Sequence, residues 1–434
     1  MCLASIKKFL RLDEHKIFML LIFCFPLFAF VIKKWVGVWG ALIFLFSLFQ
    51  IFRKPSLYFN KKGVAFFGWI FSLTSPFIVS VLVQFLRSDE FEWAVIDGPS
   101  RFLMAAFLFI YLSRRDSFDF LRSLYLPICI TLIITVIVAA LSFESNQFWQ
   151  RWSTYFVDPN TLPTYVISLF ALCVPLSRWK TSIEKILFLF VFVSVILLLF
   201  FSQSRSSWNG AMVLLFCSAF IFYLNGEFKF FAIGGLIFIG LLVSLNLSFG
   251  VVSVRYSDMF KEISEFFVGN NTSTSVGTRL GLLVFAWDLF WLNPLLGTPD
   301  GVLPSLEALK AMGIEVSRVV HEDMRLAGPH NQLVAYFLRY GVLGFLPVFG
   351  IFVVPLFVSF SYGFRLRFQN IDSDLARGLF MFILILLTCA QTIEVLNLKM
   401  TSTIYATYLA LFLSALYNQG SLRKLCLKNN LEKK

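Results

Sequence analysis

The sequence is poor in charged residues, in histidine and in cysteine. Only 14% of its 434 residues are charged, three are histidines, 58% are hydrophobic, and the mean hydropathy is +0.80. A soluble protein of this length could not bury so much apolar surface in its core. The seven cysteines include no CxxC pair, so neither a disulfide scaffold nor a zinc site is expected. Gly-rich phosphate loops and GxSxG elbows are also missing, and the acidic candidates on the outward side include no DxD pair, which disfavours nucleotide-dependent, serine-hydrolase and metal-assisted chemistry.

What the sequence has instead is a series of long apolar runs. Each is long enough, as a helix, to cross a hydrocarbon core about 30 Å thick. The runs are continuous and do not alternate, so they predict helices and not a barrel. We therefore expect an all-α polytopic membrane protein with about twelve spans, at approximately 17–32, 35–52, 64–86, 99–112, 121–142, 160–177, 186–203, 207–224, 228–249, 336–361, 376–393 and 401–417.

The distribution of Lys and Arg predicts the orientation. With both termini in the cytoplasm, the cytoplasmic segments hold 23 of the 37 Lys and Arg and 9 of the 25 acidic residues. This bias follows the positive-inside rule. The net charge of +12 therefore reflects topology, and no nucleic-acid partner is expected. An inner-membrane location follows from the same pattern.

One outward segment, residues 250–335, is far longer than a connector needs to be. It begins with an amphipathic stretch, VRYSDMFKEISEFF, and continues with an apolar stretch that Asn293-Pro294 interrupts. We expect the apolar stretch to lie along the membrane surface or to dip into it. The chain then divides into helices 1–9 (1–249), this long periplasmic loop with a partly helical lid (250–335), helices 10–12 (336–417) and a basic cytoplasmic tail (418–434).

The residues able to do chemistry gather at the outward ends of the spans. His321 and His330 lie near the end of the long loop, where an imidazole can take a proton from a hydroxyl or simply bond to a loop carbonyl. Arg205 lies between two apolar runs and Arg279 opens the apolar part of the loop. Two guanidinium groups that converge there could bind a diphosphate, whereas a lone arginine more often snorkels or pairs with a carboxylate. Glu394, at the outer end of the eleventh span, is the acidic side chain best placed to face a cavity.

Several short motifs resemble those of the bacterial O-antigen ligases. His330-Asn331, nine further residues and Gly341-Val342-Leu343-Gly344 resemble the HNx9GxxG signature of that family. Other segments resemble its RxxxL element, its Asn-Pro-Leu-x-Gly turn, its Arg-containing turn and its early outward turn: 279–283, 291–297, 204–207 and 97–101. Each motif is weak alone, but their order and sidedness agree over residues 95–400.

The resemblance implies a membrane glycosyltransferase of GT-C-like architecture. Such an enzyme transfers a polysaccharide from undecaprenyl diphosphate to the lipid A-core, inverts the anomeric centre, and needs no metal or other cofactor. Carried over by motif, His330 would be the general base, and Arg205 and Arg279 would bind the diphosphate. The weaker candidates for the site are Arg325, Arg101, Glu394, His321 and Asn331. Gly341 and Gly344 would permit close packing beside it.

Two alternatives stay open. An O-antigen polymerase would use the same lipid-linked donor with a different acceptor, and the RxxxL and HNx9GxxG pair favours the ligase. A protein oligosaccharyltransferase is a less favoured relative. A non-enzymatic transporter of lipid-linked sugars is the alternative from another class, but it would place polar residues along a path through the membrane. Here the polar features lie at the outer rim.

Overall fold

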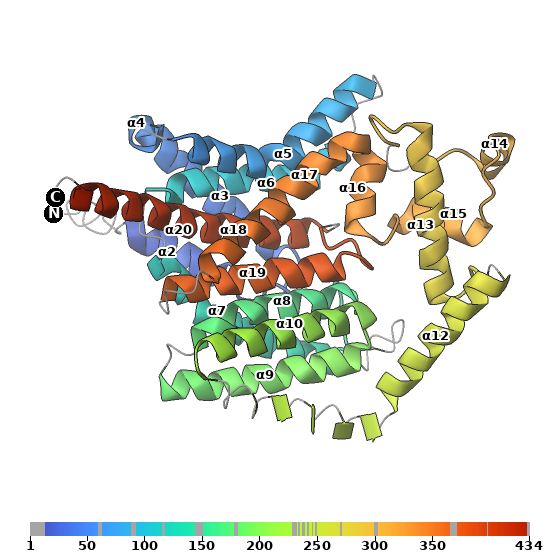
Figure 1. Ribbon diagram of the computed structural model, residues 1–434, viewed down its shortest axis with the longest axis horizontal. Coiled ribbons are helices and arrows are strands. Elements are labelled where there is room, and N and C mark those ends of the chain that lie inside the picture. Colours follow the sequence, from blue (N-terminus) through green and yellow to red (C-terminus); the bar gives the residue numbers. More distant parts are fainter. Residues whose placement is uncertain are drawn as a thin grey trace, which may run out of the picture.

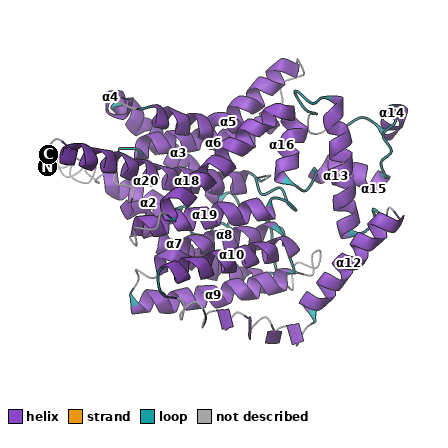
Figure 2. Cartoon of the chain, in the orientation of Figure 1, coloured by secondary structure: helices purple, strands orange, loops and turns teal. Residues whose placement is uncertain are grey.

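A computed structural model describes residues 14–431, except for 60–62, 88–92, 115–117, 144–150, 178–180, 270, 299–302, 365–370, 397 and part of 228–249. Within these residues the regular elements are all helices, joined by short loops (Figure 2). The first group comprises α2 (Glu14–Cys24), α3 (Trp35–Arg53), α4 (Pro55–Phe59), α5 (Val64–Arg87), α6 (Trp93–Leu112), α7 (Phe118–Leu141), α8 (Thr161–Leu176), α9 (Ser182–Ser202) and α10 (Arg205–Leu224).

The second group begins with the helices of the long loop. These are α12 (Val251–Gly269), α13 (Ser275–Leu292), α14 (Leu306–Ala311), α15 (Arg318–Ala327) and α16 (Gln332–Tyr340). The chain then returns to the bundle through a 3-10 turn (Gly341–Gly344), α17 (Phe345–Val348), a π-helical turn (Phe349–Val353), α18 (Val354–Gly363), α19 (Ile371–Cys389) and α20 (Lys399–Leu431).

The bundle helices run roughly side by side, and α12 to α15 cover one end of the bundle (Figure 1). We call this end the loop end; the C-terminal end of α20 lies at the opposite end. Among the described residues, nine helices are long and apolar enough to cross a membrane. An all-α polytopic membrane protein is therefore confirmed. Eight of the nine correspond to predicted spans, and α8 and α19 fill two further predicted positions. Predicted span 228–249 lies largely outside the described residues.

One of the nine, α13, belongs to the segment predicted to be a surface loop. Its 18 residues are apolar enough to span a bilayer. However, α13 runs across the ends of the bundle helices and not beside them (Figure 1). It ends at Leu292, immediately before the predicted break at Asn293-Pro294. The amphipathic stretch before it forms α12, as the sequence predicted.

Two local predictions were wrong. Span 17–32 is not one helix: α2 ends at Cys24, and turns that include Phe28 with φ 55° follow it. Eleven helical residues rise only about 16 Å, too little to cross a bilayer core. Span 336–361 lies within Gln332–Gly363, which is long and apolar enough to cross a membrane, although Gly341, with φ +57°, interrupts its regular helix. Residues 97–101 form no turn, because α6 already begins at Trp93 and includes Pro99.

The centre of the bundle is formed by α8, every residue of which is buried. Helices α19 and α10 pack against it, and α20 packs against α6. Its polar side chains find partners within the helices: Thr164 and Ser168 donate to carbonyls one turn earlier. The hydroxyl of Tyr165 donates to the carbonyl of Val395, 2.7 Å away. This satisfies polar groups that would otherwise be costly in an apolar interior.

The loop helices have a small hydrophobic core of their own. It contains Leu282, Phe285, Ala286 and Leu289 of α13, Leu309 of α14, Val320 and Met324 of α15 and Leu338 of α16. The four α13 residues recur at the spacing of one helical face, which is why α13 docks by that face. Helix α16 also contributes Tyr336 and Tyr340 to the main core of the bundle. It therefore joins the two cores.

Glycines hold the end of α13 against the break after α16. A Cβ on Gly341 would lie 2.4 Å from the carbonyl oxygen of Leu295, and one on Gly297 would lie 2.4 Å from the carbonyl oxygen of Leu338. Two backbone hydrogen bonds cross the same contact: Thr298 N donates to Leu338 O, and Val342 N to Pro294 O. The Asn-Pro-Leu-Leu-Gly turn and the first glycine of the GxxG element thus form one interlocked unit. Both glycines also have positive φ, which other residues rarely adopt.

Candidate functional site

His330 lies in a turn with a constrained backbone between α15 and α16. Its φ is +49°, and that of Gly328 is +74°. Asn331 caps α16 by accepting hydrogen bonds from the amides of Leu333 and Val334. The Asn331 side chain also donates to the carbonyl of Gln391, and Gln332 N donates to that of Ala390. The His-Asn pair therefore fixes the histidine at the start of a capped helix, anchored to the segment after α19.

The imidazole of His330 faces a carboxylate. Its Nε2 lies 3.4 Å from Oδ2 of Asp323, on α15, and each side chain is about one-third exposed, at 32% and 35%. An imidazolium at this position would be paired, and a neutral ring can direct an N–H at the carboxylate. Sequence analysis did not single out Asp323. Because only the end of α15 and one turn separate Asp323 from His330 along the sequence, the contact could have been anticipated.

Arginines converge beside this pair. Arg279 of α13 is largely buried, and its pKa is lowered first by that burial and then by the charge of Arg205. The carboxylates of Asp323 and Glu262 act in the opposite direction and raise this pKa. Arg205, the first residue of α10, has a 14% exposed side chain, and its Nη1 lies 3.7 Å from Oε2 of Glu262. That Nη1 is buried and makes no hydrogen bond within the described structure. The two predicted arginines are thus close enough to repel each other.

Glu262 of α12 has a second contact. Its Oε2 accepts a hydrogen bond of 2.9 Å from the amide of Val276, in the first turn of α13. A carboxylate is favoured there by the free amides and the dipole of the helix. Glu262 therefore connects α12, the N-terminus of α13 and Arg205 of α10. It was not among the acidic candidates taken from the sequence.

Two further arginines extend the positive cluster. The pKa of Arg151 is lowered to about 10, mainly by burial and then by the charge of Arg255, with Arg279 and Arg205 adding to it and Asp158 opposing it. Arg151 donates to the Asn160 side chain at 3.2 Å. Arg255 of α12 donates to Oε1 of Gln203 from both Nε and Nη2, at 3.2 and 3.0 Å. No sequence motif identified either arginine as part of the site.

The resulting arrangement is four arginines from three helices and one loop, with a histidine-carboxylate pair at one edge. Its field favours an anion with several negative charges. Planar guanidinium groups can hold phosphate oxygens in bidentate fashion. A base next to such an anion site can take a proton from a hydroxyl that attacks the atom bonded to the anion.

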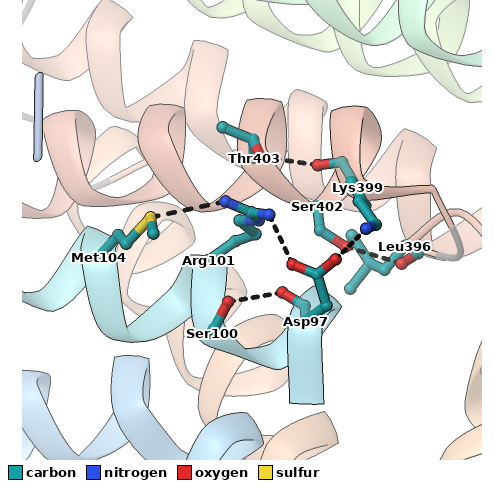
Figure 3. Close-up of polar contacts among 8 residues, drawn as sticks. All are labelled: Asp97, Ser100, Arg101, Met104, Leu396, Lys399, Ser402 and Thr403. Carbon is teal, nitrogen blue, oxygen red and sulfur yellow. Dashed lines mark hydrogen bonds and ion pairs between the residues drawn. The ribbon is translucent and has the colours of Figure 1, made fainter. Parts of the chain in front are cut away.

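Arg101 belongs to a different cluster, shown in Figure 3. It donates to Asp97 at 2.6 Å, and the other carboxylate oxygen of Asp97 contacts Nζ of Lys399. These contacts join α6 to the start of α20, and in the described structure no hydrogen bond or ion pair links Arg101 to Arg205, Arg279 or His330. The structure does not bring Arg101 to the arginine cluster.

Glu394 lies beneath the histidine turn and not in an open cavity. Its side chain is only 2% exposed and forms an ion pair of 2.8 Å with Arg339 of α16. A Cβ on Gly328 would overlap its Oε1. Glu394 therefore supports the turn that carries His330. The expectation that it faces a cavity was wrong, because its two neighbours enclose it.

The remaining candidates have local partners. His321 Nε2 lies 3.0 Å from the carbonyl oxygen of Pro304, and its ring packs near that of Phe285. His321 thus contacts a loop carbonyl, which was the alternative to a role in proton transfer. Arg325 is exposed at the end of α15. Asn331 caps the N-terminus of α16, as described above.

Comparison with known proteins adds one finding. Residues 189–349 match the family model described as O-antigen ligase. These 161 of the 434 residues are similar to that family. The matched range includes Arg205, Arg279, His330 and the interlocked glycines, whereas Arg101 and Glu394 lie outside it. This similarity indicates a membrane enzyme of the ligase or polymerase type, with a lipid-linked glycan and an acceptor as substrates. No curated protein matches the chain.

Proposed function

We propose that this protein is an O-antigen ligase of lipopolysaccharide biosynthesis. It transfers O-antigen polysaccharide from undecaprenyl diphosphate to the lipid A-core oligosaccharide, inverts the anomeric centre, and uses no metal. It lies in the bacterial inner membrane with both termini in the cytoplasm, and the loop end faces the periplasm. The observation that carries the proposal is the placement of His330 and Asp323 beside Arg279 and Arg205.

The arginines bind the donor in this mechanism. Arg205 and Arg279 take the diphosphate oxygens, and Arg151 and Arg255 add to the positive field. Because the negative charge on the diphosphate grows as its bond to the sugar breaks, these arginines stabilise the transition state more than the bound donor. Their mutual repulsion in the donor-free protein is relieved when the anion binds. The donor arrives already activated, so no nucleotide site is required.

His330 activates the acceptor. The imidazole takes the proton of an acceptor hydroxyl while its oxygen forms a bond to the anomeric carbon. The bond from that carbon to the diphosphate oxygen breaks, and the electron pair leaves with the diphosphate. Because the two oxygens lie on opposite sides of the carbon in such a direct displacement, the configuration inverts.

Reconstitution tests the proposed reaction. Purified protein in liposomes receives undecaprenyl-diphosphate glycan and lipid A-core, and the products are separated on gels. We expect glycan on lipid A-core. Longer lipid-linked chains without transfer would identify a polymerase, and movement of the donor across the bilayer without any product would identify a transporter. Product formed in EDTA and an inverted linkage by NMR are expected; inhibition by EDTA that Mg²⁺ reverses would refute the metal-free mechanism.

Variants test the assigned roles. His330→Ala is expected to lower kcat by about 100-fold or more, the typical contribution of a general base. Arg205→Ala and Arg279→Ala are expected to lose donor use while remaining folded. Arg318→Ala is the matched control, because Arg318 lies on the same loop, is 81% exposed and pairs only with Glu322 in the described structure. Near-wild-type transfer by His330→Ala would refute the base role.

A further inference from the structure

Asp323 and His330 are each held in place by their own element of the fold. Helix α15, which carries Asp323, begins at the cap Ser317 and buries Val320 and Met324 in the loop core. Asp323 is therefore fixed in orientation by the residues that flank it on the helix. His330, on the other side of the contact, is fixed by the Asn331 cap and its anchor to the segment after α19. Two separately anchored elements thus present a carboxylate to an imidazole.

The contact is made by one specific nitrogen of the ring. Nε2 of His330 faces Oδ2 of Asp323 at 3.4 Å, whereas Nδ1 makes no hydrogen bond to any described residue. A carboxylate in this position favours the tautomer that carries its proton on Nε2. Nδ1 then has a free lone pair. This is the form that a general base needs before it accepts a proton.

Asp323 is also close to the anion site. Its charge acts on Arg279, together with that of Glu262, and opposes the effects of burial and of Arg205. The other carboxylate described near the histidine turn, that of Glu394, pairs with Arg339. Asp323 therefore contacts the proposed base and also acts electrostatically on the arginine proposed to bind the leaving group.

We propose that Asp323 is the positioning residue for His330: it accepts a hydrogen bond from Nε2–H, and Nδ1 is the atom that takes the acceptor proton. The inference rests on the proposed base role of His330. In the transfer step the acceptor proton moves to Nδ1, the acceptor oxygen bonds to the anomeric carbon, and the diphosphate leaves with the electron pair of the broken bond. The imidazolium that forms keeps its Nε2–H on the Asp323 carboxylate. It returns its proton to water after the product leaves.

Asp323→Asn tests this role, because it removes the charge and keeps the shape. We expect kcat to fall by about 10- to 100-fold, as for other residues that orient a functional histidine, with the donor KM unchanged. Glu322→Gln is the matched control: it removes the same charge one residue away, from an exposed side chain that pairs with Arg318. It should transfer at the wild-type rate. Asp323→Ala replaces the Asn variant if that variant does not fold.

Double-mutant cycles separate a positioning role from a purely structural one. If Asp323 acts through His330, Asp323→Asn should have almost no further effect in the His330→Ala background and a full effect in the Arg279→Lys background, which keeps a positive charge at the anion site. A loss that disappears in the Arg279→Lys background, or a rise in donor KM, would mean that Asp323 serves the arginine instead and would overturn the inference.

Failure of the inference and failure of the proposed function give different results. If His330→Ala retains transfer, the base role itself is wrong. If His330→Ala is inactive and Asp323→Asn transfers at the wild-type rate, the base role stands and only the role of Asp323 is refuted. Melting temperature, measured for every variant, shows that the fold is intact, and binding of inorganic pyrophosphate by the His330 and Asp323 variants shows that the anion site is intact.

Discussion

The buried pair of Glu394 and Arg339 offers the sharpest test of how the histidine turn is supported. Glu394→Gln would remove the carboxylate charge that lies 2.8 Å from Arg339, whose side chain is only 17% exposed. Breaking a buried pair by changing one partner costs about 3–5 kcal/mol. We expect about 3 kcal/mol here, because Arg339 retains some contact with solvent. At about 2 °C per kcal/mol, the value for larger chains, the melting temperature should fall by about 6 °C.

The same variant should lower transfer, because the turn that carries His330 rests on Glu394. Thermal unfolding in detergent and the liposome assay measure the two effects. The control is the double variant Glu394→Gln and Arg339→Gln, which removes both charges together. It should regain most of the stability and of the transfer. If the double variant recovered its melting temperature but stayed inactive, Glu394 would take part in the chemistry and the structural role argued here would be refuted.

Three further predictions follow from the packing and the charges. Gly341→Ala should lower the free energy of unfolding by about 2–4 kcal/mol, because of the positive φ and the overlap with the Leu295 carbonyl. Gly37→Ala is the control and should not destabilise the protein, because a Cβ there meets nothing within 4 Å. Equal melting temperatures for the two variants would contradict the interlock. Inorganic pyrophosphate should raise the melting temperature of the wild type by relieving repulsion among the arginines. The rise should be smaller in Arg151→Ala and in high salt; an equal rise in Arg151→Ala would show that Arg151 is not part of the site. Arg101→Ala should lower the melting temperature but change donor kcat/KM by less than about threefold, since an ion pair that joins two helices mainly affects stability; an inactive variant with normal stability would place Arg101 in the site.

The sequence was sufficient for features that depend on local pattern. Continuous apolar runs predicted the helices of the bundle, and Asn293-Pro294 predicted the end of α13. Composition was misleading where backbone geometry decided the outcome. Residues 17–32 are as apolar as a span, but turns interrupt them, and Gly341 breaks an equally apolar run. Hydropathy counts apolar residues and does not detect a positive φ.

The candidate site was partly predictable for a similar reason. Motifs identified His330, Arg205 and Arg279 because each lies beside a recognisable pattern. Asp323, Glu262 and Arg255 lie on helices whose sequences carry no such pattern, and their role depends on how α12 and α15 dock on the bundle. Glu394 shows the opposite error. Its position at a helix end suggested exposure, but the packing of Gly328 against it encloses it.

The interlock between the end of α13 and the break after α16 limits how a lipid-linked donor can enter. Backbone groups form that contact, so no ligand can replace them. The contact of α12 with the bundle is different, because it includes the ion pair of Glu262 with Arg205 and the hydrogen bonds of Arg255 with Gln203, beside the stacking of Tyr256 on Trp208. An incoming diphosphate can take over both arginines. We therefore expect α13 to stay in place while α12 moves away from the bundle to admit the donor. This movement is expected when phosphate oxygens replace the Glu262 carboxylate as the partner of Arg205.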